Sequence, residues 1–236
     1  MCLILFAWKQ HADYPLVVAA NRDEFYARDS APAHWWPDKP GILAGRDLRA
    51  GGTWMGITAA GRFAALTNYR DPARHRDDAQ SRGDIVTAVL EASDPLAYLQ
   101  TLLAARQRFN PFNLLLAEGD SLWCLESVSG RLQRLEAGVY GLSNAFLDTP
   151  WPKVERGKRQ LSAQLGALPE TEGLFDLLSD DTIAPDADLP QTGVPLEWER
   201  LLSAALIRAP GYGTRSQTVV LCPPAGTPEL VERVLR

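Results

Sequence analysis

The sequence predicts an α+β fold in which helices pack on two antiparallel sheets. Short apolar runs separated by turn residues open the chain, and two stretches with helical spacing follow them. Strand-like runs then return, before further helical stretches and a last strand. This order is compatible with a four-layer αββα sandwich, in which two sheets face each other between two helical layers.

The first apolar runs predict a hairpin. Cys2–Trp8 and Leu16–Ala20 are rich in aliphatic and aromatic residues, and the polar, Pro-containing segment Lys9–Pro15 separates them. We interpret them as two buried antiparallel strands. Residues Asp29–Pro40 hold three prolines and two tryptophans, which indicates an ordered irregular loop.

A second strand pair and two helices follow. Gly52–Thr58 and Phe63–Thr67 flank the turn Ala59-Ala60-Gly61. Apolar residues between positions 85 and 90 then recur at helical spacing behind Ser81 or Asp84 as the expected N-cap. A second apolar stripe, at positions 96 to 103, follows Asp94-Pro95 and predicts a second helix.

The second half alternates between strands and helices. Three strands are predicted first, then a charged helix, then an Asp- and Pro-rich surface loop, a further helix behind Pro195 and two final strands. In chain order these are Asn113–Ala117, Leu122–Glu126, Val139–Leu142, Pro152–Leu165, Ser179–Val194, the stripe Trp198, Leu201, Leu202 and Ala205, Thr218–Cys222 and Leu230–Leu235.

Composition narrows the function classes. The 236 residues are 46 % hydrophobic, enough for one large domain or two small ones, and we expect a single domain over residues 1–236. Lys plus Arg number 24 against 29 for Asp plus Glu, so the net charge of −5 gives no strong basic field for nucleic acid. No stretch approaches the roughly 20 apolar residues that span a bilayer. We therefore expect neither a nucleic-acid partner nor a membrane span, and the oligomeric state stays open.

The cysteines indicate a reducing compartment. Cys2, Cys124 and Cys222 are few, odd in number and far apart, which does not fit a disulfide framework. The apolar start has no preceding basic segment, and polar residues from Lys9 onward interrupt it before a signal-peptide core is complete. We expect a cytoplasmic protein.

The second residue is the most informative for chemistry. If Met1 is removed, Cys2 carries both a thiol and a free α-amine, whose ordinary pKa values are about 8.5 and about 7.7–8.0. Proton transfer between them then needs little driving force, as in N-terminal nucleophile hydrolases. The alternative is a structural residue, because Cys2 opens an apolar run and cysteine is often a small buried hydrophobe.

A polar tetrapeptide ends the second predicted strand. It is Asn21-Arg22-Asp23-Glu24, followed by Phe25-Tyr26. A run of charges often marks where a strand reaches solvent, but an arginine beside a carboxylate can also orient a nucleophile, because its guanidinium is a rigid, permanently charged donor.

Taken together, several motifs resemble the NRDE family, which includes the transport and Golgi organisation 2 proteins. The match covers nearly the whole chain in the family's order. The motifs are Cys2, the tetrapeptide at 21–24, Gly51-Gly52-Thr53-Trp54-Met55-Gly56, Leu66-Thr67-Asn68-Tyr69-Arg70, Gly141-Leu142-Ser143-Asn144, Leu147-Asp148-Thr149-Pro150-Trp151-Pro152-Lys153 and Tyr212-Gly213-Thr214-Arg215-Ser216. The family is similar to cysteine-dependent bile-salt hydrolases and penicillin V acylases, which implies an αββα N-terminal nucleophile fold and an amidase-type site.

The resemblance also implies roles for single residues. Cys2 matches the acylases' nucleophile, the backbone N–H of Asn68 and the side-chain amide of Asn144 match their oxyanion hole, and Arg215 matches their late arginine. Arg22 and Asp23 match the acylases' arginine and aspartate more loosely, since the acylases separate theirs by two residues. Neighbours on a strand point to opposite faces, so without a bulge Arg22 and Asp23 cannot both face Cys2, and Glu24 is the substitute for Asp23.

The sequence offers no metal site or resident cofactor. His11, His34 and His75 are scattered, and none pairs with another His or Cys at metal-ligand spacing. His34 stands beside Trp35-Trp36, where it could ligate or stack on haem, although a surface histidine is the commoner case.

Two functions remain open at this point. One is a hydrolase that cleaves an amide or thioester of a small acyl substrate through Cys2. The other is a carrier without catalysis, holding a hydrophobic anionic ligand such as haem or acyl-coenzyme A, because members of the family have been linked to haem trafficking and acyl-coenzyme A metabolism. The seven tryptophans would suit a large apolar pocket.

Overall fold

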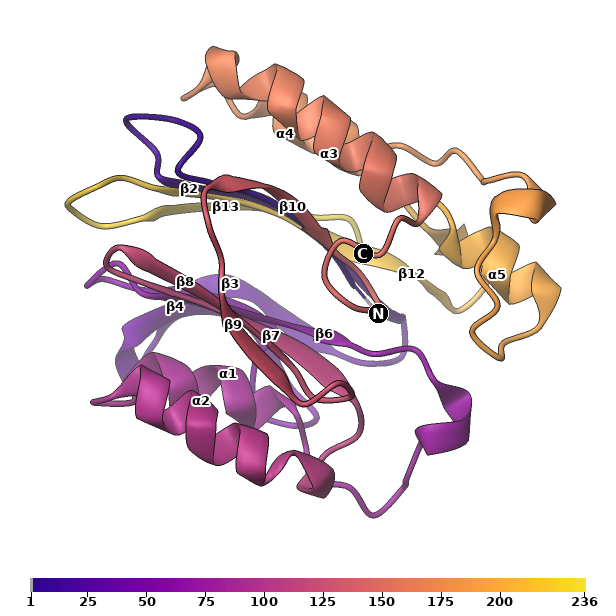
Figure 1. Ribbon diagram of the computed structural model, residues 1–236, viewed down its shortest axis with the longest axis horizontal. Coiled ribbons are helices and arrows are strands. Elements are labelled where there is room, and N and C mark those ends of the chain that lie inside the picture. Colours follow the sequence, from indigo (N-terminus) through magenta and orange to yellow (C-terminus); the bar gives the residue numbers. More distant parts are fainter. Residues whose placement is uncertain (1) are drawn as a thin grey trace.

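The chain folds into four layers. The computed structural model describes the backbone of residues 2–236 and the side chains of residues 3–236. Two sheets face each other, with α1 (Gly83–Glu91) and α2 (Pro95–Ala104) covering one outer face (Figure 1). The other outer face is covered by α3 (Pro152–Gln164) and α4 (Glu172–Leu178), with α5 (Leu196–Leu202) at one end. The predicted αββα architecture is confirmed.

Both sheets are antiparallel. The first has the order β10-β1-β2-β12-β11, with β13 also paired to β12. The second runs in chain order from β3 to β9, with α1 and α2 inserted between β6 and β7. The strands are β1 Cys2–Trp8, β2 Leu16–Phe25, β3 Ser30–Trp36, β4 Lys39–Asp47, β5 Met55–Thr58, β6 Phe63–Asn68, β7 Phe112–Glu118, β8 Ser121–Glu126, β9 Arg131–Arg134, β10 Gly138–Leu142, β11 Arg208–Ala209, β12 Tyr212–Cys222 and β13 Glu229–Val234.

Strand alternation explains the uninterrupted apolar runs of β1 and β2. Even-numbered residues such as Ile4 and Val18 enter the core between the sheets. Odd-numbered residues such as Leu5 and Ala19 pack under α3 and α4. Because this sheet is covered on both faces, its central strands are apolar at nearly every position.

Of the five α-helices in the described residues, only α2 has a side-chain cap at its start. Asp94 precedes α2 as predicted, and its carboxylate accepts a hydrogen bond from the backbone N–H of Ala97 at 2.9 Å. At α1 the N-cap is Arg82, so the predicted caps Ser81 and Asp84 were each wrong by one or two residues. The described residues also form four short 3₁₀ helices: η1 Pro72–Arg74, η2 Arg106–Arg108, η3 Leu165–Ala167 and η4 Asp186–Asp188.

The predicted loop Asp29–Pro40 was wrong, because β3 and the start of β4 occupy it. β3 is the edge strand of its sheet, and an edge strand tolerates proline, since one side of its backbone needs no ladder partner. The prediction also missed β9 and α4, and it began β5 three residues early. Among the described residues, no helix has both the length and the apolar content needed to cross a membrane.

Candidate functional site

The backbone of Cys2 lies beside the Asn21-Arg22-Asp23-Glu24 tetrapeptide. In the β1–β2 ladder, the Cα of Cys2 is registered with that of Arg22, and Arg22 is in turn registered with Ser216 of β12. Because β2 continues to Phe25, the whole tetrapeptide belongs to the strand. The side chain of Cys2, the predicted nucleophile, lies outside the described residues.

Arg22 enters the space between the sheets. Its guanidinium carbon lies 4.0 Å from the ring centroid of Trp54, and its Nη1 donates to Ser30 Oγ at 3.1 Å. The residue is 5 % exposed. A stacked, hydrogen-bonded arginine has a fixed orientation, so its positive charge is held in place at this strand end.

Asp23 points to the other face. Thr214 Oγ1 donates to its carboxylate at 2.7 Å, and burial raises the pKa of Asp23, while the charge of Lys153 acts in the opposite direction. The one irregularity in the pairing of β2 with β12 lies between Thr214 and Ser216 on β12, so β2 itself keeps its alternation through Arg22 and Asp23. Glu24, the substitute considered for Asp23, is half-buried, and its carboxylate accepts the backbone N–H of Phe25.

Two polar residues without an assigned role stabilise the helical layer over this strand, one from β2 and one from α3. Asn21 Nδ2 donates to the carbonyls of Leu178 and Ala205, each at 2.8 Å. Lys153, at the start of α3, is buried, and its Nζ donates to the carbonyl of Leu202 at 2.9 Å. Both residues stand in the family motifs, but their partners come from segments that no motif covers.

The structure brings Asn68 and Asn144 together. Asn144 Nδ2 donates to the carbonyl of Asn68 at 2.8 Å, and the backbone N–H of Arg70 donates to the carbonyl of Asn144 at 2.7 Å. An amide nitrogen carries two hydrogens, so the bond to Asn68 leaves Asn144 one further donor. Among the described residues, Asn144 Oδ1 has no hydrogen-bond partner.

Arg215 is directed elsewhere. Its Nη1 donates to the carbonyls of Phe25, Tyr26 and Arg28 at 3.0–3.1 Å, and its Nε donates to the carbonyl of Arg236 at 2.8 Å. Three of these contacts bind the chain where it leaves β2, and the fourth binds the last residue of the chain. The structure therefore does not bring the Arg215 guanidinium to the two asparagines.

A buried ion pair lies close to the asparagine pair. Arg70 and Glu199 meet at 3.0 Å with side chains 4 % and 5 % exposed. The second carboxylate oxygen of Glu199 accepts both the backbone N–H and the hydroxyl of Thr192 at 2.7 Å. The Arg70 guanidinium also lies over the ring of Trp151 at 4.8 Å. Burial lowers the pKa of Arg70, and Glu199 counteracts this shift.

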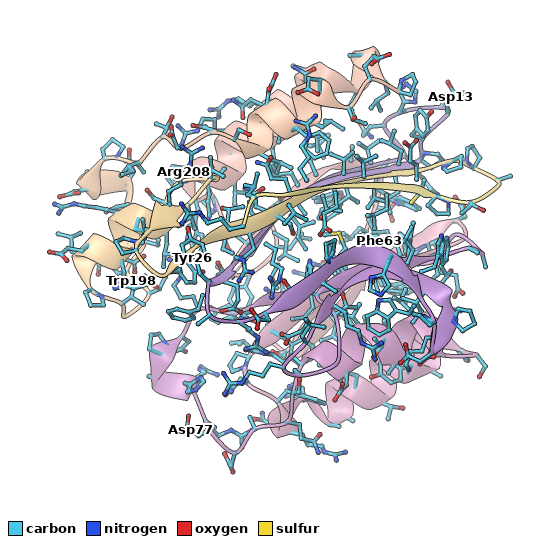
Figure 2. The ribbon with its side chains drawn as sticks, turned by 180° about the vertical axis from the view of Figure 1, so that it is seen from behind. Asp13, Tyr26, Phe63, Asp77, Trp198 and Arg208 are labelled. Atoms are coloured by element: carbon cyan, nitrogen blue, oxygen red, sulfur yellow. The ribbon has the colours of Figure 1, made fainter. Side chains whose placement is uncertain are left out.

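A cleft of about 540 Å³ opens at this end of the molecule, and Arg22, Asp23 and Asn68 all line it. In Figure 2, Tyr26, Trp198 and Asp77 lie toward this end, whereas Phe63 lies between the sheets farther along. Five arginines and four acidic residues line the cleft. They are Arg22, Arg28, Arg49, Arg76, Arg82, Asp23, Glu24, Asp47 and Asp77.

Two of these charges, those of Arg28 and Asp47, neutralise each other. Arg28 Nε meets Asp47 at 2.6 Å. Although burial acts in the opposite direction, the N–H of Ala50 and the Arg28 guanidinium lower the pKa of Asp47. Asp47 is therefore ionised at neutral pH, and in the rest of the lining four arginines stand against three acidic residues.

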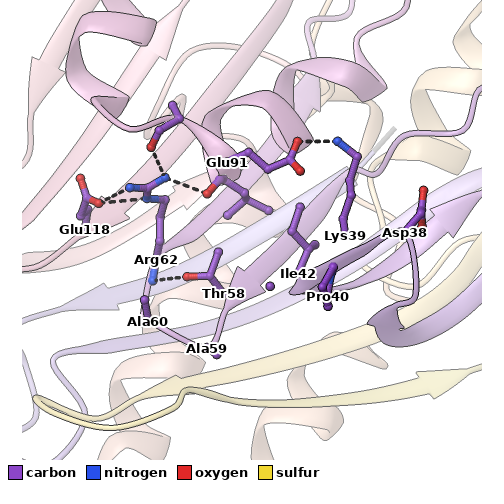
Figure 3. A pocket seen from close by; sticks show the side chains of 13 residues that line it. Asp38, Lys39, Pro40, Ile42, Thr58, Ala59, Ala60, Arg62, Glu91 and Glu118 are labelled. Carbon is purple, nitrogen blue, oxygen red and sulfur yellow. Dashed lines mark hydrogen bonds and ion pairs between the residues drawn. The ribbon is translucent and has the colours of Figure 1, made fainter.

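A larger hollow of about 660 Å³ lies at the junction of α1, β4 and β5 (Figure 3). Its central cation, Arg62, donates to the carbonyls of Val89, Leu90 and Ala92 at the end of α1 and to Glu118. Arg62 thus caps a helix. None of the predicted site residues described by the structure lines this hollow.

Comparisons with known proteins support the motif analysis. The sequence model of the family "Transport and Golgi organisation 2" matches residues 1–236. The human transport and Golgi organization protein 2 homolog is 36 % identical over 99 % of this chain and 92 % of its own length. The Drosophila melanogaster protein of that name is 33 % identical over 94 % of this chain and 87 % of its own length.

A solved structure shares the fold. The Caenorhabditis elegans ortholog of N-acylethanolamine-hydrolyzing acid amidase matches all of both chains with a TM-score of 0.50 at 10 % identity. At this identity the likeness concerns the fold, which is that of the N-terminal nucleophile hydrolases.

Proposed function

The chain belongs to the transport and Golgi organisation 2 family, and we propose that it hydrolyses an amide or thioester of a small acyl compound through Cys2 after removal of Met1. The observation that carries this proposal is the β1–β2 register, which sets the Cys2 backbone opposite Arg22 at the end of a hydrolase-type sandwich. The substrate would enter the cleft lined by Arg22, Asp23 and Asn68.

The proposed reaction has two halves. The α-amine of Cys2 takes the thiol proton, the sulfur attacks the acyl carbon, and the ammonium returns the proton to the departing amine or thiol. Water then loses a proton to the amine, attacks the thioester on Cys2 and releases the acid and the free thiol. The remaining N–H of Asn144 and the backbone N–H of Asn68 would stabilise the oxyanion in both halves.

The charged residues of the tetrapeptide would position these groups. Arg22 is fixed by Trp54 and Ser30, so it supplies a constant positive charge beside the nucleophile's strand. Asp23 lies on the opposite face with Thr214, and we assign it the role of holding the local backbone and charge balance with Lys153 rather than contact with substrate.

Intact-mass spectrometry with an activated acyl ester tests the proposal. We expect the purified protein to lack Met1 and to gain one acyl group, on Cys2, while Cys2→Ala gains none. Cys124→Ala is the matched control and should acylate normally, because Cys124 is fully buried and its thiol pKa is raised by burial. A retained Met1, or acylation that persists in Cys2→Ala, would refute this mechanism.

The charge of the cleft favours a second candidate, a carrier of a hydrophobic anion such as haem or acyl-coenzyme A. Five arginines line the same cleft, and guanidinium groups bind carboxylates and phosphates. Binding of either ligand should then be equal in wild type and Cys2→Ala, with no turnover in wild type. If the purified protein binds neither ligand, the carrier function is wrong.

A further inference from the structure

A third and smaller hollow lies next to the cleft, between η1, η2 and the turn that follows β8. Its volume is about 290 Å³, just below the roughly 300 Å³ at which sites for drug-sized ligands begin. Three arginines line it, together with Gln107 and Ser127, and none of its described lining residues is acidic. The arginines are Arg74, Arg76 and Arg106.

Arg106 is held in place with an unused donor. Its Nη1 donates to the carbonyl of Leu103 at 3.0 Å. Its Nε is buried and has no hydrogen-bond partner among the described residues. Gly130, with φ of +71°, has the left-handed backbone conformation that favours glycine, and a Cβ there would make ordinary contact with Nη2 at 3.4 Å. A buried N–H without a partner is unfavourable, so an acceptor beside this guanidinium would be favoured.

The loop that carries Arg76 is also fixed. The side chain of Asn110 accepts the backbone N–H of Arg76 and donates to its carbonyl, both at 2.8 Å. Arg76 Nη2 donates to the carbonyl of Gln107 at 2.6 Å, which leaves its other N–H groups for a ligand. Arg74 is exposed and pairs with Asp71 at 2.8 Å.

Ser127 adds a hydroxyl at the base of the hollow. Its Oγ accepts the backbone N–H of Phe112 at 2.8 Å, so its own proton remains to be donated. The neighbouring Glu126 does not line the hollow, because its carboxylate accepts from the backbone N–H of Leu147 and the hydroxyl of Ser129. Among the described residues, Glu126 therefore forms no ion pair with the arginines of the hollow.

From these contacts we propose that the hollow is a binding site for a phosphate group, either inorganic phosphate or a small phosphomonoester. Guanidinium groups from three positions and a hydroxyl match a tetrahedral dianion with several acceptor oxygens better than a planar carboxylate. Arg76 lines both this hollow and the cleft, so a bound phosphate stiffens the cleft wall formed by residues 75–82.

Calorimetric titration at low ionic strength tests the site, with inorganic phosphate and glycerol phosphate as separate probes. Arg106→Gln and Arg74→Gln should each weaken binding by about tenfold, since each removes a charge-assisted hydrogen bond. Arg108→Gln is the matched control, because Arg108 belongs to the same η2 turn, is exposed and does not line the hollow. It should change binding less than about twofold.

Each result bears on the proposal. Selective weakening by Arg106→Gln and Arg74→Gln at unchanged thermal midpoint supports the site, and the tighter of the two probes identifies free phosphate or phosphomonoester as the ligand. If Arg106→Gln destabilises the fold, Arg74→Gln alone decides, because Arg74 is exposed. Absence of binding by wild type, or equal weakening by Arg108→Gln, overturns the proposal and leaves general charge attraction.

Discussion

The buried pair Arg70–Glu199 gives a prediction that needs no substrate. Glu199→Gln keeps a side chain of the same shape and an oxygen for the two Thr192 donors, but it removes the negative charge 3.0 Å from the guanidinium. The buried guanidinium of Arg70 then loses the charge of the Glu199 carboxylate. Removing one member of a buried ion pair typically costs about 3–5 kcal/mol.

This cost converts into a measurable change. For a chain of this size, about 2–4 °C of melting temperature is lost per kcal/mol, so Glu199→Gln should lower the midpoint by about 6–20 °C. Urea unfolding gives the free energy directly. Asp186→Asn is the control, because Asp186 pairs with Arg200 in solvent, with side chains 54 % and 44 % exposed, and an exposed pair contributes at most about 1 kcal/mol.

A double substitution separates charge from packing. Arg70→Met with Glu199→Gln removes both charges and keeps an oxygen for the two Thr192 donors, so the double variant should be more stable than Glu199→Gln alone. Our reasoning is refuted if Glu199→Gln unfolds within about 1 kcal/mol of wild type, the scale of an exposed pair.

Three further predictions concern single residues. Burial raises the pKa of Asp23, so the folded protein binds a proton there more tightly than the unfolded chain does. The free energy of unfolding should therefore fall as pH rises from 3.8 toward the folded pKa, and urea unfolding measured across pH should show no such fall for Asp23→Asn. Gly52→Ala places a Cβ 2.4 Å from the backbone at the start of α1, so it should lower the free energy of unfolding in urea by about 1–3 kcal/mol. Gly41→Ala is the control, because nothing lies within 4 Å of its Cβ, and equal effects of the two variants would contradict the contact. Burial raises the thiol pKa of Cys222 to about 12 and raises that of Cys124, so iodoacetamide at pH 7.5 should alkylate neither until denaturant is added, as peptide mass mapping can check.

Sequence periodicity predicted the elements whose neighbours in the chain are also neighbours in space. The β1–β2 hairpin and the start of α2 at Asp94-Pro95 were confirmed because local apolar spacing and a local cap determine them. β3 was missed because a proline at a sheet edge has the composition of a loop. β4 is an interior strand, and it was missed because Pro40 and two glycines interrupt its apolar residues. The start of β12 was missed because its first five residues are polar or small, although tertiary packing buries all of them.

In the candidate site, too, the motifs predicted which residues take part, but the sequence did not predict their long-range contacts. The family motifs placed Asn68 and Asn144 in one prediction, and the structure brings them to 2.8 Å. The contacts of Asn21 with Leu178 and Ala205 join residues more than 150 positions apart, which no local pattern encodes. The four carbonyls bound by Arg215 were equally inaccessible, because a motif gives the residue type and not the direction of its side chain.

The opposite orientation of two consecutive residues couples the cleft to separate parts of the protein. Substitutions that loosen the packing of Trp54 should displace the guanidinium of Arg22 and leave the carboxylate of Asp23 in place. Changes around Thr214 should have the converse effect. The guanidinium of Arg22 and the carboxylate of Asp23 can therefore be displaced independently, each from its own side of the sheet, without altering the peptide that joins the two residues.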